Sequence, residues 1–124
     1  MNQTKTILIV DDDARNIFAL SALLKAKGYI CRSAASAVEA FDILSNQKDI
    51  GIVLLDMMMP DMDGYEAIPI IQANERAAHI PIVAVTAQAM VGDKEKCLQA
   101  GADAYISKPV DVDRLLQLLN TYMQ

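Results

Sequence analysis

The sequence predicts one α/β domain, in which helices cover both faces of a five-stranded parallel sheet to give a doubly wound three-layer sandwich. Strand-like and helix-like segments alternate five times along the chain. The strand-like segments are continuous apolar runs, which is typical of strands buried on both faces of a parallel sheet. Right-handed crossovers then place helices on both faces. Because the chain has 124 residues, we expect a single domain over residues 1–124.

The first predicted unit is a strand over residues 7–10 and a helix over residues 14–27. Apolar residues recur at helical spacing in the second segment, and Gly28 follows it as a C-terminal stop. Asp13 is expected to cap this helix. The second unit begins with a short strand over residues 29–32.

The second helix is expected to start after Ser36, which suits an N-cap. Its predicted apolar face contains Val38, Phe41 and Leu44. The third strand then covers residues 50–55.

The third helix is expected over residues 65–73, after a loop at 57–64 that is rich in turn residues. Pro69 lies inside it, although a proline in a helix interior costs about 3 kcal/mol. Two alternatives stay open: the helix begins late with Pro69 in its first turn, or it is kinked at Pro69.

The last two units follow the same pattern. A strand over residues 82–85 precedes a helix over 93–100, whose thin apolar stripe consists of Cys97 and Leu98. Such a helix is expected to be loosely held. A strand over residues 104–107 precedes a helix that is capped by Asp111 and has a broad apolar face, made of Val112, Leu115, Leu116, Leu119, Tyr122 and Met123.

Composition excludes several classes of function. A net charge of −5 and a pI near 4.6 argue against direct contact with nucleic acid, which requires a basic face. No apolar run approaches the roughly 20 residues that span a bilayer, and the N-terminus does not resemble a signal peptide, so we expect no membrane insertion. Cys31 and Cys97 are widely separated and are interpreted as reduced thiols. These features favour a cytoplasmic protein.

Polar residues follow four of the predicted strands. Asp11 and Asp12 follow the first, Asp56 the third, Thr86 the fourth and Lys108 the fifth. Because the carboxyl ends of parallel strands meet at one edge of a sheet, these groups are expected to converge in one crevice. Carboxylates, a hydroxyl and an ammonium together predict a site for a divalent cation and a phosphoryl group.

Neighbouring carboxylates repel, and each raises the cost of ionising the next, so a site that holds Asp11, Asp12 and Asp56 requires a cation. Hard oxygen ligands favour Mg²⁺. Asp56 is then a candidate acceptor that forms an aspartyl phosphate. Mg²⁺ and the Lys108 ammonium would neutralise phosphoryl oxygens, and the Thr86 hydroxyl would donate to one of them. A cis Lys108–Pro109 peptide is a plausible way to aim the lysine inward.

Four segments resemble the receiver domain of two-component response regulators, in order and at the family's spacing: ILIVDD at 7–12, LLDMMMPDMDG at 54–64, VTA at 85–87 and YISKP at 105–109. The likeness extends from about residue 6 to residue 122. It implies a flavodoxin-like fold, with five strands in the order 2-1-3-4-5 and five helices. The stretch from 79 to 97 is similar to receivers of hybrid sensor histidine kinases.

The resemblance implies roles for particular residues. It makes Asp56 the phosphoacceptor and assigns Mg²⁺ to Asp12, Asp56 and the backbone carbonyl of Met58, with Asp11 acting through water. Thr86 and Lys108 would sense the phosphoryl group. Tyr105, on the fifth strand, would swing inward when Thr86 moves, and so change the surface formed by the fourth helix, fifth strand and fifth helix.

The implied protein is a phosphorelay switch and not a turnover enzyme. It would accept a phosphoryl group from a sensor histidine kinase or a histidine phosphotransfer protein, and would bind a downstream protein with its switched surface. Whether it is a stand-alone protein or a domain of a hybrid kinase stays open. The sole histidine, His79, is expected to be a surface residue rather than a phosphodonor.

Three alternatives compete with this interpretation. Asp11-Asp12-Asp13 also fits the opening motif of haloacid-dehalogenase-type phosphatases, with Asp11 as nucleophile, but Asp56 would then have no role. A receiver-like docking module without phosphorylation would have no need of the acidic set. A flavin-binding module would require hydroxyls or glycines where the three aspartates stand.

Met58, two residues after Asp56, departs from a polar expectation for this loop. Its side chain has only a weak sulfur acceptor and so cannot orient an attacking water. We therefore expect a phosphoryl group on Asp56 to be long-lived.

Overall fold

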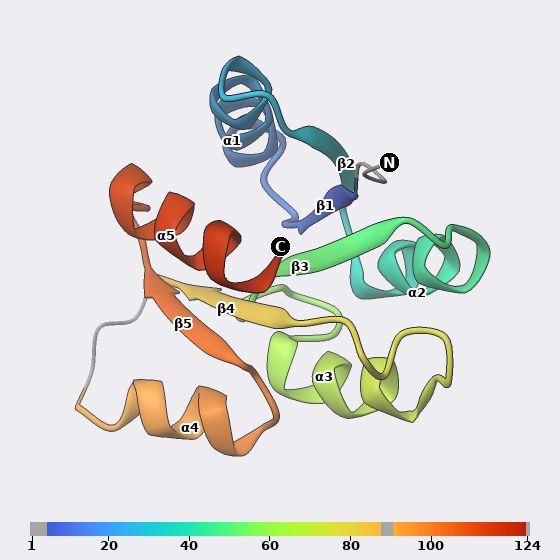
Figure 1. Cartoon of the computed structure of the whole chain (residues 1–124). Helices are drawn as coiled ribbons and strands as arrows, with labels where there is room; N and C mark the ends of the chain where they lie inside the picture. The colour runs from blue at the N-terminus through green and yellow to red at the C-terminus, as the bar shows by residue number, and fades with distance from the viewer. Residues whose placement is uncertain (1–4, 88–90, 124) are drawn as a thin grey trace.

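A computed structural model of the chain describes residues 5–87 and 91–123 (Figure 1). Residues 88–90 of the stretch that is similar to hybrid-kinase receivers lie outside the described residues. One parallel sheet has the strand order β2-β1-β3-β4-β5, which confirms the flavodoxin-like prediction. The elements in chain order are β1 (Thr6–Val10), α1 (Ala14–Ala26), β2 (Ile30–Ala34), α2 (Ala37–Asn46), β3 (Ile50–Asp56), α3 (Gly64–Ala73), β4 (Ile82–Thr86), α4 (Asp93–Gln99), β5 (Ala104–Ser107) and α5 (Val112–Tyr122).

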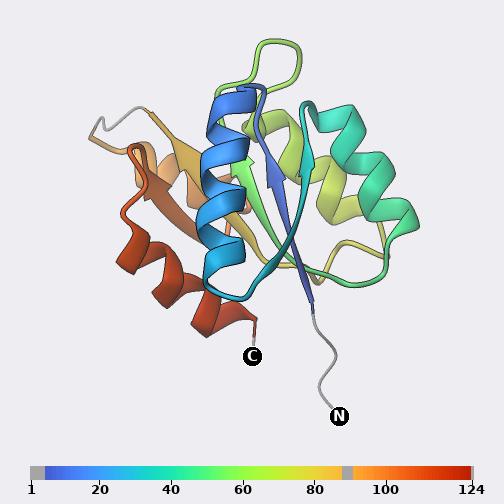
Figure 2. The same cartoon turned by 90° about the horizontal axis from the view of Figure 1, so that it is seen from above.

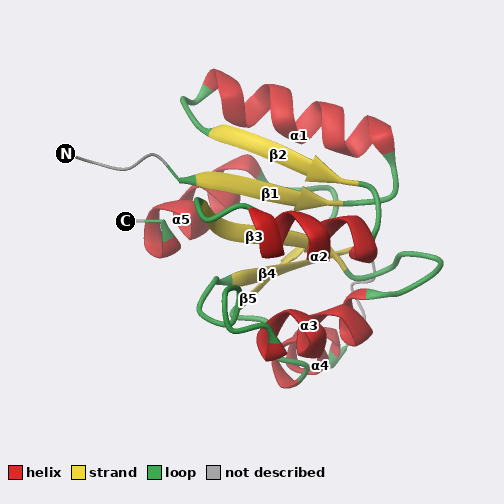
Figure 3. Cartoon of the chain, turned by 90° about the vertical axis from the view of Figure 1, so that its right-hand side faces the viewer, coloured by secondary structure: helices red, strands yellow, loops and turns green. Residues whose placement is uncertain are grey.

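Helices cover both faces of the sheet, with α1 and α5 on one face and α2, α3 and α4 on the other (Figures 1 and 3). Side chains alternate between the two faces along each strand. In β1, Leu8 and Val10 therefore pack into the core beneath α2 and α3, whereas Ile7 and Ile9 pack against α1 and α5. All residues of β1 are buried, as the continuous apolar run predicted.

The strands all point to one end of the molecule (Figure 2). The register aligns Val10 with Leu55, Asp56 with Val85, and Thr86 with Ser107. Polar groups at the ends of β1, β3, β4 and β5 consequently lie at the same edge of the sheet. The start of β1 and the end of α5 lie at the opposite end (Figure 2).

Side-chain caps define the starts of four helices. Asp13, Ser36 and Asp111 each accept a backbone N–H at the start of the helix that follows, which confirms the predicted caps. Asp63 caps α3 and forms a reciprocal capping box with Glu66 that the sequence reading missed. The D-x-x-E spacing was the signal for it.

The observed bounds of α3 rule out one of the two alternatives for Pro69. The helix begins at Gly64, one residue before the predicted start, and continues through Pro69 to Ala73. A late start at Pro69 is therefore wrong, because the capping box stabilises the earlier turn and Ile68 and Ile71 anchor the helix in the core. Pro69 itself is exposed. A kink at this residue stays a prediction.

Two apolar faces also differ from the prediction. Val38 is 69% exposed, and the buried face of α2 consists of Ala37, Ala40, Ile43 and Leu44. The prediction gave weight to large apolar residues, whereas close approach of the helix to the sheet favours small alanines. Leu98 of α4 is likewise exposed, while Cys97 is fully buried.

The second strand is also shifted from its predicted position. It is Ile30–Ala34, which extends two residues beyond the predicted end. β2 is an edge strand with an exposed Ile30, so its local sequence carries a weak signal.

The corrected face of α2 can be tested by truncating two residues of the same helix. Leu44→Ala should lower the free energy of unfolding by about 2–5 kcal/mol, because it removes buried atoms and leaves a cavity. Val38→Ala, the control, should change it by less than about 0.5 kcal/mol. Urea unfolding measures both, and equal losses would contradict the assigned face.

Candidate functional site

Two buried carboxylates lie at the carboxyl edge of the central strands. Asp11 directly follows β1 and is 3% exposed, and Asp56 ends β3 and is 4% exposed. Asp12 is exposed beside them. Each of the three residues offers a carboxylate oxygen, and these oxygens lie within 4.8 Å of one another. The predicted gathering of acids is therefore present in the fold.

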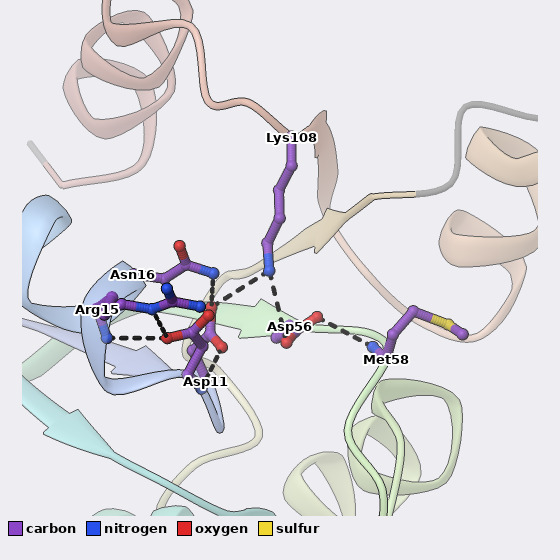
Figure 4. Close-up of polar contacts among 7 residues, drawn as sticks. Asp11, Arg15, Asn16, Asp56, Met58 and Lys108 are labelled. Carbon is purple, nitrogen blue, oxygen red and sulfur yellow. Dashed lines mark hydrogen bonds and ion pairs between the residues drawn. The ribbon is translucent and has the colours of Figure 1, made fainter.

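Lys108 extends from the end of β5 toward both buried carboxylates (Figure 4). Its Nζ lies 3.3 Å from Oδ2 of Asp11 and 3.6 Å from Oδ2 of Asp56. Its backbone N–H donates to the carbonyl of Thr86 over 2.8 Å, which joins the ends of β4 and β5. The Lys108–Pro109 peptide is cis, as expected. One ammonium thus compensates part of the charge of two buried acids.

Asp11 is fixed by further donors. The backbone N–H of Asp13 donates to its Oδ1 over 2.9 Å, and the side-chain amide of Asn16 donates to its Oδ2 over 3.4 Å (Figure 4). Sequence reasoning missed Asn16. Its place in the first turn after three aspartates was the only available signal, and that spacing does not say which way the amide points.

The two carboxylate oxygens of Asp56 have different partners: Oδ1 accepts a hydrogen bond from the backbone, and Oδ2 lies near the Lys108 ammonium. The backbone N–H of Met58 donates to Oδ1 over 3.0 Å (Figure 4). Burial is the main cause that raises the pKa of Asp56, and the charge of Asp11 adds to it. The Met58 hydrogen bond and the Lys108 charge act in the opposite direction without cancelling the increase. Additional positive charge at this site would therefore favour the ionised form.

The residues present fit a hard divalent cation. The donor set is three carboxylates, two buried and one exposed, which suits Mg²⁺ because this ion prefers oxygen ligands and keeps several of its waters. Exposure of Asp12 leaves one side of the cluster open to solvent. The Met58 carbonyl as a ligand, and Asp11 acting through water, stay predictions.

Thr86 and Tyr105 lie where the sequence placed them. Thr86 ends β4 and is 1% exposed, and its register opposite Ser107 brings it to the edge where Lys108 begins. Tyr105 is half-buried on β5, and its O–H donates to Oδ2 of Asp93 over 3.3 Å. The sensing role of Thr86 and the movement of Tyr105 stay predictions.

The three methionines after Asp56 have different environments. Met57 and Met59 are buried and anchor the loop, whereas Met58 is 48% exposed. The side chain of Met58 therefore lies at the surface and carries no strong polar group, while its backbone N–H donates to Asp56.

Comparison with known proteins agrees with this geometry. Residues 7–120 match the model of the response regulator receiver domain family. The chain is 37% identical, over 97% of both sequences, to the polar-differentiation response regulator DivK of Brucella ovis. A response regulator receiver protein from Pseudomonas putida superposes with a TM-score of 0.89 at 35% identity, covering 98% of this chain and 99% of that one.

A second solved structure bears on the metal. The receiver domain of sensor histidine kinase PA1611 from Pseudomonas aeruginosa PAO1 superposes with a TM-score of 0.86 at 34% identity, covering 97% of this chain and 98% of that one. That domain has a magnesium ion coordinated in its active site cleft.

The raised pKa of Asp56 predicts that the folding stability of the metal-free protein depends on pH. Because the folded state binds the proton more tightly than the unfolded state does, this carboxyl makes stability fall as pH rises from near 3.8 through the raised pKa. Asp56→Asn removes that contribution. Its melting temperature in EDTA should therefore exceed that of the parent by a margin that grows over this pH range.

Circular dichroism melts at a series of pH values measure this margin. Asp61→Asn, which neutralises an exposed acid in the loop after β3, is the control. Its melting temperature should differ from that of the parent by an amount that does not change with pH. A constant margin for Asp56→Asn would contradict the burial penalty.

Proposed function

The chain belongs to the response regulator receiver family, and from that premise we propose that Asp56 is its phosphoacceptor, with Mg²⁺ as the required ion. The protein is a phosphoacceptor signalling switch of a two-component system. The observation that carries the residue assignment is the Lys108 ammonium, which lies within 4 Å of both Asp11 and Asp56 at the edge where the strands end. The proposed acceptor Asp56, the Lys108 ammonium and the acidic cluster thus lie together at this edge of the sheet.

The transfer forms one bond and breaks another. A carboxylate oxygen of Asp56 attacks the phosphorus of a phosphohistidine, the P–O bond forms, and the P–N bond breaks as its electron pair returns to the imidazole. Asp12, Asp56 and the Met58 carbonyl would hold Mg²⁺, with Asp11 acting through water, and the bound ion would supply positive charge for the phosphoryl oxygens. The protein's contribution is mainly the position and charge of its side chains.

Lys108 and Thr86 respond to the new charge. A phosphoryl group on Asp56 offers Lys108 a doubly charged partner in place of the single carboxylate. The Thr86 hydroxyl, one strand away, donates to a phosphoryl oxygen, and Tyr105 then moves inward behind it. The altered surface is α4, β5 and α5, which binds the downstream protein.

The partners follow from this chemistry. The donor is a sensor histidine kinase or a histidine phosphotransfer protein, and the acidic net charge of −5 disfavours direct contact with nucleic acid. Across residues 5–87 and 91–123, no helix has the length and apolar character needed to cross a bilayer. We place the protein in the cytoplasm, as a single receiver domain over residues 1–124 that assists its own phosphorylation without turning over a substrate.

Neither rival function gains support. A phosphatase with Asp11 as nucleophile is disfavoured because it leaves Asp56, a buried carboxylate beside Lys108, without a role. A docking module without phosphorylation leaves the acidic cluster, with its two buried carboxylates, unexplained.

Acetyl phosphate provides the direct test. With Mg²⁺, the parent should gain the mass of one phosphoryl group, and peptide mapping should locate it at Asp56. Asp56→Asn should gain none, EDTA should abolish the gain in the parent, and Asp61→Asn should behave like the parent. A label that persists on the Asp56→Asn variant would refute the assignment.

Met58 should slow the loss of the phosphoryl group. Met58→Asn places an amide beside Asp56 that can orient water, and one hydrogen bond worth about 1–1.5 kcal/mol corresponds to a roughly tenfold faster hydrolysis. Met58→Leu, which stays apolar, should match the parent. The measurement is the decay of phosphorylated protein after the donor is removed, and an unchanged rate for Met58→Asn would count against the hypothesis.

A further inference from the structure

A buried carboxylate lies between two tyrosines on the α4 side of the sheet. Asp93, the first residue of α4, is only 7% exposed. Its Oδ1 accepts from the O–H of Tyr65 on α3 over 3.1 Å, and its Oδ2 accepts from the O–H of Tyr105 on β5 over 3.3 Å. Three elements that lie side by side in Figures 1 and 3 are therefore joined through one side chain.

Both tyrosines are donors at neutral pH. Their phenols are protonated there at the ordinary tyrosine pKa, and burial raises the pKa of Tyr65 and of Tyr105 further. The Tyr65 hydroxyl also lies 3.6 Å from Sγ of the buried Cys97, and Nζ of Lys96 lies 4.8 Å from the centre of the Tyr65 ring. Tyr65 is thus held by contacts on its ring and its hydroxyl, and this fixes the direction of the Asp93 carboxylate.

The hydrogen bond to Tyr105 is specific to one position of its ring. If Tyr105 moves away from α4, Oδ2 of the buried Asp93 loses that donor, and a charged group deprived of a hydrogen bond in a buried place is destabilised. An interaction that exists in only one of two states shifts the equilibrium toward that state. The Asp93 carboxylate therefore favours the position of Tyr105 seen in this structure, in which the half-buried ring lies against α4.

We infer that Asp93 is a positioning residue of the switch: its carboxylate, oriented by Tyr65, holds Tyr105 against α4 in the resting state and so opposes the state that binds a phosphoryl group at Asp56. This inference rests on the proposed function. By linkage, weakening the Asp93–Tyr105 bond raises the population of the binding-competent state and so strengthens binding at the phosphoryl site, by at most the same factor. The tyrosine–aspartate contact thus sets how strongly a phosphoryl group must act to change the α4 surface.

Beryllofluoride with Mg²⁺, a non-covalent mimic of the phosphoryl group, gives an equilibrium test. The chain has four tyrosines and no tryptophan, so protein labelled with 3-fluorotyrosine should give four ¹⁹F signals, and Tyr105→Phe identifies that of Tyr105. In the parent, the Tyr105 signal should move as beryllofluoride binds. Asp93→Ala should bind the mimic roughly threefold to tenfold more tightly, with the free-state signal of Tyr105 already displaced toward the bound position.

Two comparisons separate this role from a general loosening of α4. Glu95→Ala removes an exposed acid from the same helical turn and should leave the affinity unchanged. Tyr105→Phe removes only the donor hydroxyl and should raise the affinity by about the same factor as Asp93→Ala. In the double variant, Asp93→Ala should add nothing, because the hydroxyl it restrains is gone.

The outcomes also distinguish this inference from the proposed function. If the parent does not bind beryllofluoride, the proposed function fails and the inference with it. If the parent binds but Asp93→Ala leaves the affinity unchanged, or its effect persists in the Tyr105→Phe background, only the inference fails. If Asp93→Ala does not fold, Tyr105→Phe decides, and an unchanged affinity in that variant overturns the proposal.

Discussion

The two ion pairs of Lys108 are the interaction on which the rest of the site depends. Asp11 and Asp56 are almost fully buried at the ends of neighbouring strands, and one ammonium lies close to both. Exposed Asp12 adds a third negative charge within the same few ångströms. One lysine cannot neutralise three acids, so the site retains an excess of negative charge. That excess of negative charge favours the binding of a divalent cation. A bound cation would in turn offset the repulsion between the carboxylates and an anionic phosphoryl group.

The sheet provides the precision that this chemistry requires. Both faces of the central strands are packed, so the edge that carries Asp56, Thr86 and the base of Lys108 has little freedom to move. The loop after Asp56 is also fixed, because Gly64 donates its N–H to the Met57 carbonyl over 3.1 Å. A Cβ at Gly64 would lie 2.9 Å from the Met57 backbone, so this close approach requires glycine.

A series of contacts connects the acidic site to the start of α4. The backbone N–H of Lys108 donates to the carbonyl of Thr86, and Tyr105 lies three residues earlier, on β5. From Tyr105, a hydrogen bond reaches Asp93 at the start of α4, a helix that begins after Gly92 without a side-chain cap. A local change of charge at Asp56 thus has a short chain of contacts to a weakly capped helix, in keeping with a surface that responds to phosphorylation.

The sequence by itself determined the alternation of strands and helices, the caps at Asp13, Ser36 and Asp111, and the polar residues at the sheet edge, because these depend on local patterns and on the direction of parallel strands. Only the tertiary structure decided which face of α2 is buried, that α3 runs through Pro69, and which carboxylate oxygens of Asp11 and Asp56 the Lys108 ammonium approaches. The contacts of Asp93 with Tyr65 and Tyr105 join residues 28 and 12 positions apart. Such contacts are set by the packing of whole elements against one another, and no local pattern encodes the direction in which a side chain then points.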